Sequence, residues 1–263
     1  YGNDMQRYID AKFRLIENMR SGDLLIYNAD DEQIAKHLNQ KHIAITSEFF
    51  TEGFYQNGYI SMPGLSVVGE EACLDEEGRL IFTELPLLGR HNGMNMSAAI
   101  MRLGVEPEQV QQALASFKNA PHRLERVGTV NGVVFVNDSK ATNIESAYYA
   151  LDSFNTPVVW IAGGIDKGND YEKLRPLVER NVKALVCLGQ DNSKLMKALG
   201  ERVGFSDETK DINEAVAKAY HLSEAKDVVL LSPACASFDL FKNYEDRGEQ
   251  FKEAVASLQG IKF

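Results

Sequence analysis

Polar residues that could bind an anion follow the apolar run 133–136, which is predicted to be a buried strand. Residues 137–143 read NDSKATN and bring a carboxylate, an ammonium, hydroxyls and amides to the start of a predicted helix. Free backbone N–H groups at a helix start also favour an anion. Asp, Ser, Thr and Asn are ordinary capping and turn residues, but capping does not call for Lys140, which is unfavourable near the positive end of a helix. The segment therefore favours binding over capping alone.

Two further strand ends carry unusual residues. Residues 162–168 (AGGIDKG) combine paired glycines with Lys167 but match neither GxxxxGK[ST] nor GxGxxG, so a plain turn is an equally good interpretation. Residues 231–238 (LSPACASF) are small enough to let a ligand approach the backbone closely. A capped helix start explains Ser237 and Phe238. It does not explain the density of polar residues that follow, which are Lys242, Asn243, Tyr244 and Arg247.

Other polar residues have ordinary explanations of similar weight. His122 and Arg123 lie at a presumed joint between domains, where a stacking ring and a phosphate-binding guanidinium would suit a nucleotide in a cleft. A solvated His-Arg pair is the alternative. His91, Asn92 and Asn95 open a predicted helix and are explained equally well as caps. The five histidines of the chain show no zinc-ligand spacing.

The first part of the chain is predicted to contain a helix, a small α/β region, short antiparallel strands and two further helices. The ranges are helix 1–20, strand 23–27, helix 31–37, strand 42–47, antiparallel segments within 55–83, and helices 92–103 and 107–117.

Strands alternate with helices in the remainder of the chain, and Asn131-Gly132 is a strong hairpin signal. The predicted strands are 127–130, 133–136, 158–162, 184–188, 228–231 and a weaker one at 202–205, and the predicted helices are 143–154, 171–179, 193–199, 212–222 and 238–258. This pattern indicates an α/β fold with a doubly wound parallel sheet. Ligands of such sheets bind at the carboxyl ends of the strands. The domain boundary is expected within 119–121.

Composition and charge exclude several classes of protein. The 263 residues carry 28 Lys+Arg against 38 Asp+Glu, which gives a net charge of −10 and a pI near 5.1. A surface of this sign repels nucleic acid and anionic membranes, so any anionic ligand needs a local basic site. With 44% apolar and 25% charged residues, the chain is typical of a globular protein of one or two domains. The nearly uncharged run 228–238 is about half the ~20 residues that a membrane helix needs.

The cysteines and the start of the chain indicate a cytoplasmic location. Cys73, Cys187 and Cys235 fit neither a disulfide framework nor a CxxC metal site, so they are predicted to be reduced core residues. Cys235 has no evident base in the sequence and is therefore a poor candidate for a nucleophile. Residues 1–20 do not resemble a signal peptide. They begin an amphipathic helix without an initiator Met, as expected of a cut through a longer protein.

The segments HNGMN, PHRLE, NDSKATN, GGIDKG and SPACASFDLFKNYEDRG, in this order, resemble the ATP-dependent Mur ligases of bacterial peptidoglycan synthesis. The resemblance runs from about Gln6 to the end of the chain. It is strongest to the branch that adds D-glutamate, because NDSKATN and SPACAS with the following KNYEDRG are specific to that branch. GGIDKG and HN are shared loosely with sibling ligases.

The resemblance implies a reaction and a set of site residues. ATP would phosphorylate the carboxylate of UDP-N-acetylmuramoyl-L-alanine, and the amine of D-glutamate would attack the acyl phosphate. Such chemistry depends mainly on placement and electrostatics. The residues implied for D-glutamate are Thr142, Lys167, Ser237, Phe238 and Tyr244. Those implied for the nucleotide are Asn92, Asn95, Arg123 (phosphate), Asp138 (ribose hydroxyls) and Lys140.

The resemblance also implies that Lys12 reacts with CO2 to form a carbamate that helps to hold Mg2+. This chemistry needs a neutral amine, so the lysine must be buried or crowded. The carbamate then supplies the anionic oxygens that Mg2+ prefers. Without the resemblance, Lys12 reads as a solvated helix lysine.

Several family features are absent from the sequence: the GTNGK[ST] phosphate loop, the acidic Mg2+ ligand after it, a metal-binding His and the domain that binds the UDP sugar. We therefore expect residues 1–119 to be the latter part of a central ATP-binding domain, and residues 120–263 to be a complete Rossmann-like C-terminal domain. The piece alone is expected to be inactive and to self-associate through an exposed sheet edge, whereas the intact enzyme is expected to be a monomer. The alternatives are a nucleotide- or amino-acid-binding module without ligase activity and a sibling ligase that adds another amino acid.

Overall fold

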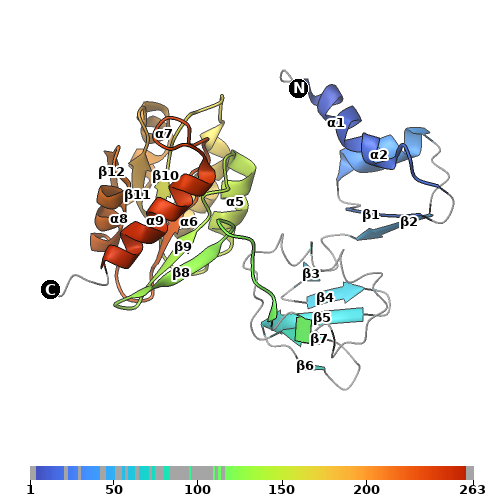
Figure 1. The fold of residues 1–263 in the computed structure, drawn as a ribbon, viewed down its shortest axis with the longest axis horizontal. Helices are drawn as coiled ribbons and strands as arrows, with labels where there is room; N and C mark the ends of the chain where they lie inside the picture. Colours follow the sequence, from blue (N-terminus) through green and yellow to red (C-terminus); the bar gives the residue numbers. More distant parts are fainter. Residues whose placement is uncertain are drawn as a thin grey trace. The chain divides into compact units, whose positions relative to one another are not determined.

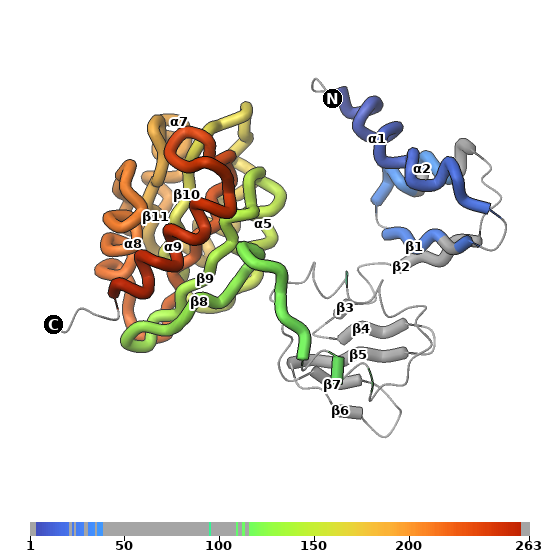
Figure 2. The backbone as a smooth tube through the Cα atoms, in the orientation of Figure 1, coloured from blue at the N-terminus to red at the C-terminus, as the bar shows by residue number. Residues whose placement is uncertain are grey.

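The computed structural model describes residues 4–20, 23–28, 31–41, 46–50, 55–56, 59–62, 65–70, 73–74, 80–82, 95, 109, 112–113 and 116–258. The chain divides into two compact units, the second of which contains Lys118–Phe263. Figure 2 traces the backbone of each unit in the colours of the sequence. The two units are described separately below. Within the described ranges, no helix has the length and apolar character needed to cross a bilayer.

The first unit begins with the predicted helix, which is α1 (Met5–Phe13) followed by a 3₁₀ turn at Arg14–Ile16. The side chain of Asp4 caps α1 by accepting a hydrogen bond from the N–H of Arg7, at 3.1 Å. The remaining elements are β1 (Leu24–Asn28), α2 (Glu32–Lys41), β2 (Thr46–Phe50), β3 (Tyr55–Gln56), β4 (Tyr59–Met62), β5 (Leu65–Glu70), β6 (Cys73–Leu74) and β7 (Leu80–Phe82).

Strand pairing in the first unit differs in part from the prediction. β1 and β2 form a parallel pair, and β2 ends three residues later than the predicted strand 42–47, of which 42–45 lie outside the described residues. The other strands form a sheet in the order β3-β4-β5-β7-β6. The antiparallel prediction for 55–83 is wrong at one pair, because β5 and β7 run parallel. Most of the predicted helices 92–103 and 107–117 lies outside the described residues.

The second unit contains a six-stranded sheet in the order β12-β11-β10-β13-β9-β8. The bounds are β8 (Glu125–Val130), β9 (Val133–Asn137), β10 (Val158–Ala162), β11 (Val182–Leu188), β12 (Phe205–Thr209) and β13 (Val228–Leu231). β8 and β9 form the predicted hairpin, with Asn131 and Gly132 at φ 48° and 84° as a type I′ turn requires. The other neighbouring strands are parallel. Continuous apolar runs such as β10 form the interior because both of their faces are buried.

Helices cover both faces of this sheet, as the α/β alternation predicts (Figure 1). One face carries α5 (Ile144–Asp152), a 3₁₀ turn (Tyr171–Leu174), α6 (Arg175–Asn181) and α7 (Ser193–Leu199), and the other carries α8 (Ile212–His221) and α9 (Tyr244–Leu258). The fold class is therefore confirmed as a doubly wound, mainly parallel α/β sheet. The last strand, β13, lies between β9 and β10, so three strands from separate parts of the sequence end side by side.

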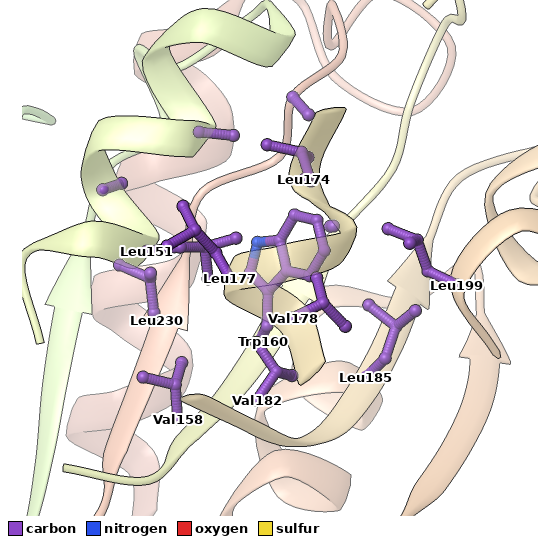
Figure 3. Close-up of a cluster of buried hydrophobic side chains, with 14 of the residues drawn as sticks. Leu151, Val158, Trp160, Leu174, Leu177, Val178, Val182, Leu185, Leu199 and Leu230 are labelled. Carbon is purple, nitrogen blue, oxygen red and sulfur yellow. The ribbon is translucent and has the colours of Figure 1, made fainter. Parts of the chain in front are cut away.

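The core on the α5–α7 face is built around Trp160, which is fully buried. Figure 3 shows its indole ring among leucine and valine side chains that include Leu151, Leu174 and Val178. The indole Nε1 donates a hydrogen bond of 2.8 Å to the carbonyl oxygen of Ser232, directly after β13. Trp160 therefore ties the apolar core to one of the polar loops at the strand ends.

Two element boundaries were predicted incorrectly. The weak strand at 202–205 is instead a 3₁₀ turn at Gly200–Arg202 followed by β12. The last helix starts at Tyr244 and not at Phe238, because Asn243 and Asp246 cap it. The Asn243 side chain accepts from the Asp246 N–H at 2.7 Å, and the Asp246 side chain accepts from the Lys242 N–H at 3.0 Å. The residues from Phe238 to Asn243 are consequently a loop.

Replacing Trp160 by Phe is expected to lower the free energy of unfolding of the second unit by about 1–3 kcal/mol, because the smaller ring leaves a void and the Ser232 carbonyl loses its donor. Urea denaturation followed by circular dichroism measures this change. Phe205→Leu, at a side chain that is 48% exposed, is the control and should change stability by less than ~0.5 kcal/mol. An equal effect of both substitutions would contradict the role of the indole.

Candidate functional site

The loops after β9, β10 and β13 form one edge of the second unit, because these strands are parallel neighbours. Ile165, after β10, forms a β-bridge with Ala236, after β13. Lys140, after β9, places Nζ 5.2 Å from the centre of the Tyr244 ring at the start of α9. The structure thus brings to one edge the predicted site residues Arg123, Asp138, Lys140, Thr142, Lys167, Ser237, Phe238 and Tyr244.

The paired glycines after β10 are required by how closely the backbones approach. Gly163 and Gly164 have φ of 127° and 124°, which side-chain-bearing residues rarely adopt. A Cβ on Gly163 would lie 2.6 Å from the carbonyl oxygen of Leu188, and one on Gly164 would overlap the carbonyl oxygen of Ala236. The loops after β10, β11 and β13 therefore touch through their main chains.

The turn that presents Lys167 is fixed by Asp166. Its Oδ1 accepts the N–H groups of Gly168 and Asn169, at 2.6 and 3.0 Å, and the Lys194 ammonium at 3.1 Å. Burial raises the pKa of Asp166, but these hydrogen bonds outweigh it and hold the pKa below its ordinary value. Lys167 itself is exposed and forms no hydrogen bond or ion pair within the described part of the chain.

The polar side chains of Asn169 and Tyr171 contact the loop after β13. Asn169 donates through Nδ2 to the carbonyl oxygen of Ala234 at 3.0 Å, and the Tyr171 hydroxyl lies 3.2 Å from the Cys235 sulfur. Cys235 is 1% exposed, and its burial raises the pKa of the thiol. The prediction that Cys235 is a core residue is confirmed. Its partners Asn169 and Tyr171 could not be predicted from the sequence, because they come from a distant segment.

The groups available for a ligand at this edge are cations and hydroxyls. The side chains of Thr142 and Ser237 form no hydrogen bond among the described residues. Thr142 is half-buried and Ser237 is only 2% exposed, whereas Phe238 beside it is 66% exposed. Arg123 and Lys140 also have no acidic partner within ion-pair distance in the described ranges. A chain with a net charge of −10 therefore leaves several cations unpaired at one edge, which suits an anion.

Asp138 is buried and already serves the protein itself. The Leu124 N–H donates to Oδ1 at 3.1 Å, and the Ser232 hydroxyl donates to Oδ2 at 2.8 Å. Burial raises the pKa of Asp138 to about 7, although these hydrogen bonds and the charges of Arg123 and Arg247 act to lower it. A ribose hydroxyl would have to share the carboxylate with these two donors.

His122 is not placed to stack on a nucleotide, in contrast to the prediction for the domain joint. The residue is 5% exposed, and its Nδ1 lies 3.0 Å from Nδ2 of Asn137. The ring fills a notch in α9 at Gly248, where a Cβ would overlap Nδ1. His122 adopts a positive φ of 64°. Sequence reasoning missed this role because the notch is formed by a glycine far along the chain.

The remaining predicted residues belong to the first unit. Asn92 lies outside the described residues, and Asn95 is an exposed helical residue. Lys12 is exposed on α1, with Nζ 5.4 Å from the centre of the Tyr8 ring. The burial that carbamate chemistry requires is therefore not provided by the described residues. Nor do they contain a group of three or more His, Cys, Asp or Glu that could hold a metal ion.

A cavity of about 540 Å³ lies at the neighbouring ends of β11 and β12, lined by residues that include Gln190, Asn192, Thr209 and Lys210. None of the predicted site residues lines it. It adjoins the loop after β13 through Gln190, whose N–H donates to Asp239 at 3.0 Å. The unpaired cations lie instead at the β9–β13–β10 edge, which is therefore the candidate site.

Comparison with protein families gives two matches. Residues 1–103 match the Mur ligase middle domain, and residues 122–235 match the Mur ligase, glutamate ligase domain. UDP-N-acetylmuramoylalanine--D-glutamate ligases from Christiangramia forsetii and Bacteroides thetaiotaomicron are 44% and 42% identical to 98% of this chain. The chain spans 58% of the length of each.

Solved structures with a similar fold are more distant in sequence. A MurF ligase from Thermotoga maritima in complex with ADP has a TM-score of 0.62 at 13% identity, over 98% of this chain and 58% of its own. Folylpolyglutamate synthase from Mycobacterium tuberculosis, complexed with ADP, has a TM-score of 0.64 at 15% identity, over 98% of this chain and 60% of its own. At these identities the likeness concerns the fold alone.

Gly164→Ala is expected to destabilise the second unit more than Gly168→Ala does. Both glycines have positive φ, but a Cβ on Gly168 would meet nothing within 4 Å. Gly168→Ala should therefore cost only the backbone strain, about 1–2 kcal/mol, and Gly164→Ala the overlap with Ala236 as well. The fluorescence of Trp160, the single tryptophan, monitors urea unfolding of this unit. Equal losses of stability in the two variants would show that the loops after β10 and β13 can move apart without a cost in free energy.

The buried Asp138 carboxyl is expected to make the second unit less stable as pH rises. Its pKa is about 7 in the folded protein and near 3.8 when unfolded, so the folded state binds more protons between these values. The stabilisation from the neutral carboxyl is complete below pH 4 and is lost as pH rises through 7, by roughly 4 kcal/mol at most.

Asp138→Asn tests this pH dependence, because the neutral amide can accept from the Leu124 N–H and donate to the Ser232 hydroxyl once that hydroxyl turns to accept. We expect the variant to be more stable than the original at pH 8 and nearly independent of pH between 5 and 8, as measured by urea unfolding. Asp191→Asn, at an exposed carboxylate, should leave the pH dependence unchanged. A dependence that persists in Asp138→Asn would assign it to another group.

Proposed function

Because the chain belongs to the Mur ligase family, we propose that it carries the amino-acid-binding part of a ligase that joins D-glutamate to UDP-N-acetylmuramoyl-L-alanine with ATP. The observation that carries the proposal is the convergence of unpaired Lys167, Thr142 and Ser237 on loops from three neighbouring strands. The names of the similar relatives favour D-glutamate over the amino acids of sibling ligases. They give no support to a binding module without ligase activity.

In this proposal the second unit holds D-glutamate by its carboxylates. The Lys167 ammonium pairs with one carboxylate, which strengthens the contact because both groups are charged. The hydroxyls of Thr142 and Ser237 can donate to carboxylate oxygens, and Phe238 and Tyr244 provide apolar walls. The role of these residues is to place the amine of D-glutamate for attack on an acyl phosphate, since positioning supplies much of the rate of such a reaction.

The nucleotide is proposed to face the same edge. Arg123 and Lys140 are unpaired cations that can approach phosphates, whereas Asp138 organises the loop from beneath. Asn92 and Asn95, in the first unit, are proposed as further nucleotide-binding residues, as the family resemblance implies. We propose that residues 1–119 belong to a central ATP-binding domain and residues 120–263 to the amino-acid-binding domain. Substrates of this kind, ATP and a UDP-linked precursor, place the reaction in the cytoplasm.

Lys167→Ala and Ser237→Ala test the proposal in the full-length ligase that carries this sequence. Each substitution should raise the KM for D-glutamate by about 10- to 100-fold, because each removes a hydrogen bond to a charged group. The KM for ATP should change little. Lys197→Ala, at an exposed lysine on α7, is the matched control and should leave both constants unchanged. Unaltered D-glutamate kinetics in both variants, or a preference of the unmodified enzyme for another amino acid, would refute the assignment.

A further inference from the structure

Arg247, on the buried side of α9, is 1% exposed and extends beneath the candidate site. Its guanidinium forms three hydrogen bonds, all to acceptors in loops. Nε donates to the Ser139 hydroxyl at 2.9 Å, Nη2 donates to the Ser139 carbonyl at 2.8 Å, and Nη1 donates to the Cys235 carbonyl at 3.2 Å. One rigid, planar group therefore connects the loop after β9 to the loop after β13.

The Ser139 hydroxyl extends this connection to the start of α9. It accepts from Arg247 and donates to the carbonyl oxygen of Tyr244 at 2.7 Å. The loops that it joins carry Thr142 on one side and Ser237 on the other. A change in the position of the guanidinium would therefore alter the spacing between these two hydroxyls.

Stability alone does not explain a charge at this position. Arg247 has no carboxylate within 4 Å in the part of the chain that the structure describes, and its burial lowers its pKa to about 10, so it remains charged at neutral pH. The charges of Asp138 and Asp239 act on it only from a greater distance. Burying a charge against neutral acceptors is costly, and apolar residues often stabilise such positions better. The guanidinium of arginine presents its donors as a planar fork of fixed geometry, which neither lysine nor an apolar residue provides.

We infer that Arg247 is a positioning residue, which holds Thr142 and Ser237 at the spacing that one amino-acid substrate bridges. The identity of the substrate rests on the proposed function, whereas the clamp rests on the three hydrogen bonds alone. Its guanidinium also adds positive charge beneath a site for carboxylates. Arg247 touches no substrate in this account and acts through the loops that it joins.

Hydrogen exchange tests the clamp independently of any ligand. The Lys140 N–H donates to His122, and the Ile165 N–H donates to Ala236, so these amides report the loops after β9 and β13. In Arg247→Lys both should exchange at least about tenfold faster, while the amides of β10 and β11 keep their rates, because lysine keeps the charge but loses the fork. Ser139→Ala, which removes the Nε acceptor, should act in the same direction and serves if Arg247→Lys fails to fold. Unchanged loop rates, or uniform acceleration of all amides, would overturn the inference.

Binding of D- and L-glutamate to the 263-residue chain then tests the consequence for the substrate. We expect the unmodified chain to prefer D-glutamate, and Arg247→Lys to lose at least about tenfold in D-glutamate affinity, with a smaller loss for L-glutamate. Global destabilisation would instead weaken both alike. Arg180→Lys, at an exposed arginine paired with Asp152, is the matched control and should change neither affinity.

The two measurements separate the clamp from the proposed function. If the unmodified chain binds neither enantiomer, the assignment of D-glutamate to this site fails, and hydrogen exchange alone decides the clamp. If Arg247→Lys binds D-glutamate with unchanged affinity and preference, the positioning role is refuted although the proposed function stands.

Discussion

The chain after β10 passes so close to the chain after β13 that Gly164 has no room for a Cβ beside the Ala236 carbonyl. This close approach follows from the strand order. β13 is the last strand in the sequence, but it lies between β9 and β10 in the sheet. The rest of the site depends on it. Lys167 and Ser237 come from distant parts of the sequence, and the loops that carry them meet only because no side chain lies between the two main chains.

Polar groups hold the three loops in addition to the apolar packing of Ala234 and Cys235. Backbone N–H and C=O groups in loops at strand ends have no hydrogen-bond partner within the sheet. When such groups are buried, they need partners elsewhere. Asp138 satisfies the Leu124 N–H, Asp166 satisfies two N–H groups of its own turn, and Arg247 satisfies two carbonyl groups. Because other side chains meet these internal demands, the cations Arg123, Lys140 and Lys167 and the hydroxyls of Thr142 and Ser237 have no such partner within the described ranges.

The sequence predicted those features that depend on local pattern. Strands 158–162 and 228–231 match β10 and β13, since continuous apolar runs of this length form strands buried on both faces. The hairpin at Asn131-Gly132 was equally predictable, because few residues adopt its backbone angles. The alternation of strands and helices also led to the proposal that the site lies at the strand ends.

Features that depend on distant partners could not be predicted. His122 reads as a solvated or stacking residue until Gly248 supplies its notch. Arg247 reads as one more polar residue of a helix, because its acceptors lie in two other segments. The helix α9 starts at Tyr244 because the Asn243 side chain caps it by accepting from the Asp246 N–H. The sequence pattern alone was equally consistent with a helix that begins at Phe238.

We propose that one edge of the second unit, formed by the loops after β9, β10 and β13, binds an amino acid through its carboxylates. An NMR titration of the isotope-labelled chain with D-glutamate tests it most directly, because backbone shifts locate a ligand without any substitution. We expect saturable shifts confined to residues 138–143, 163–168 and 232–239. Shifts that instead centre on Gln190, Thr209 and Lys210, which line the cavity at β11 and β12, or an absence of saturable shifts, would contradict it.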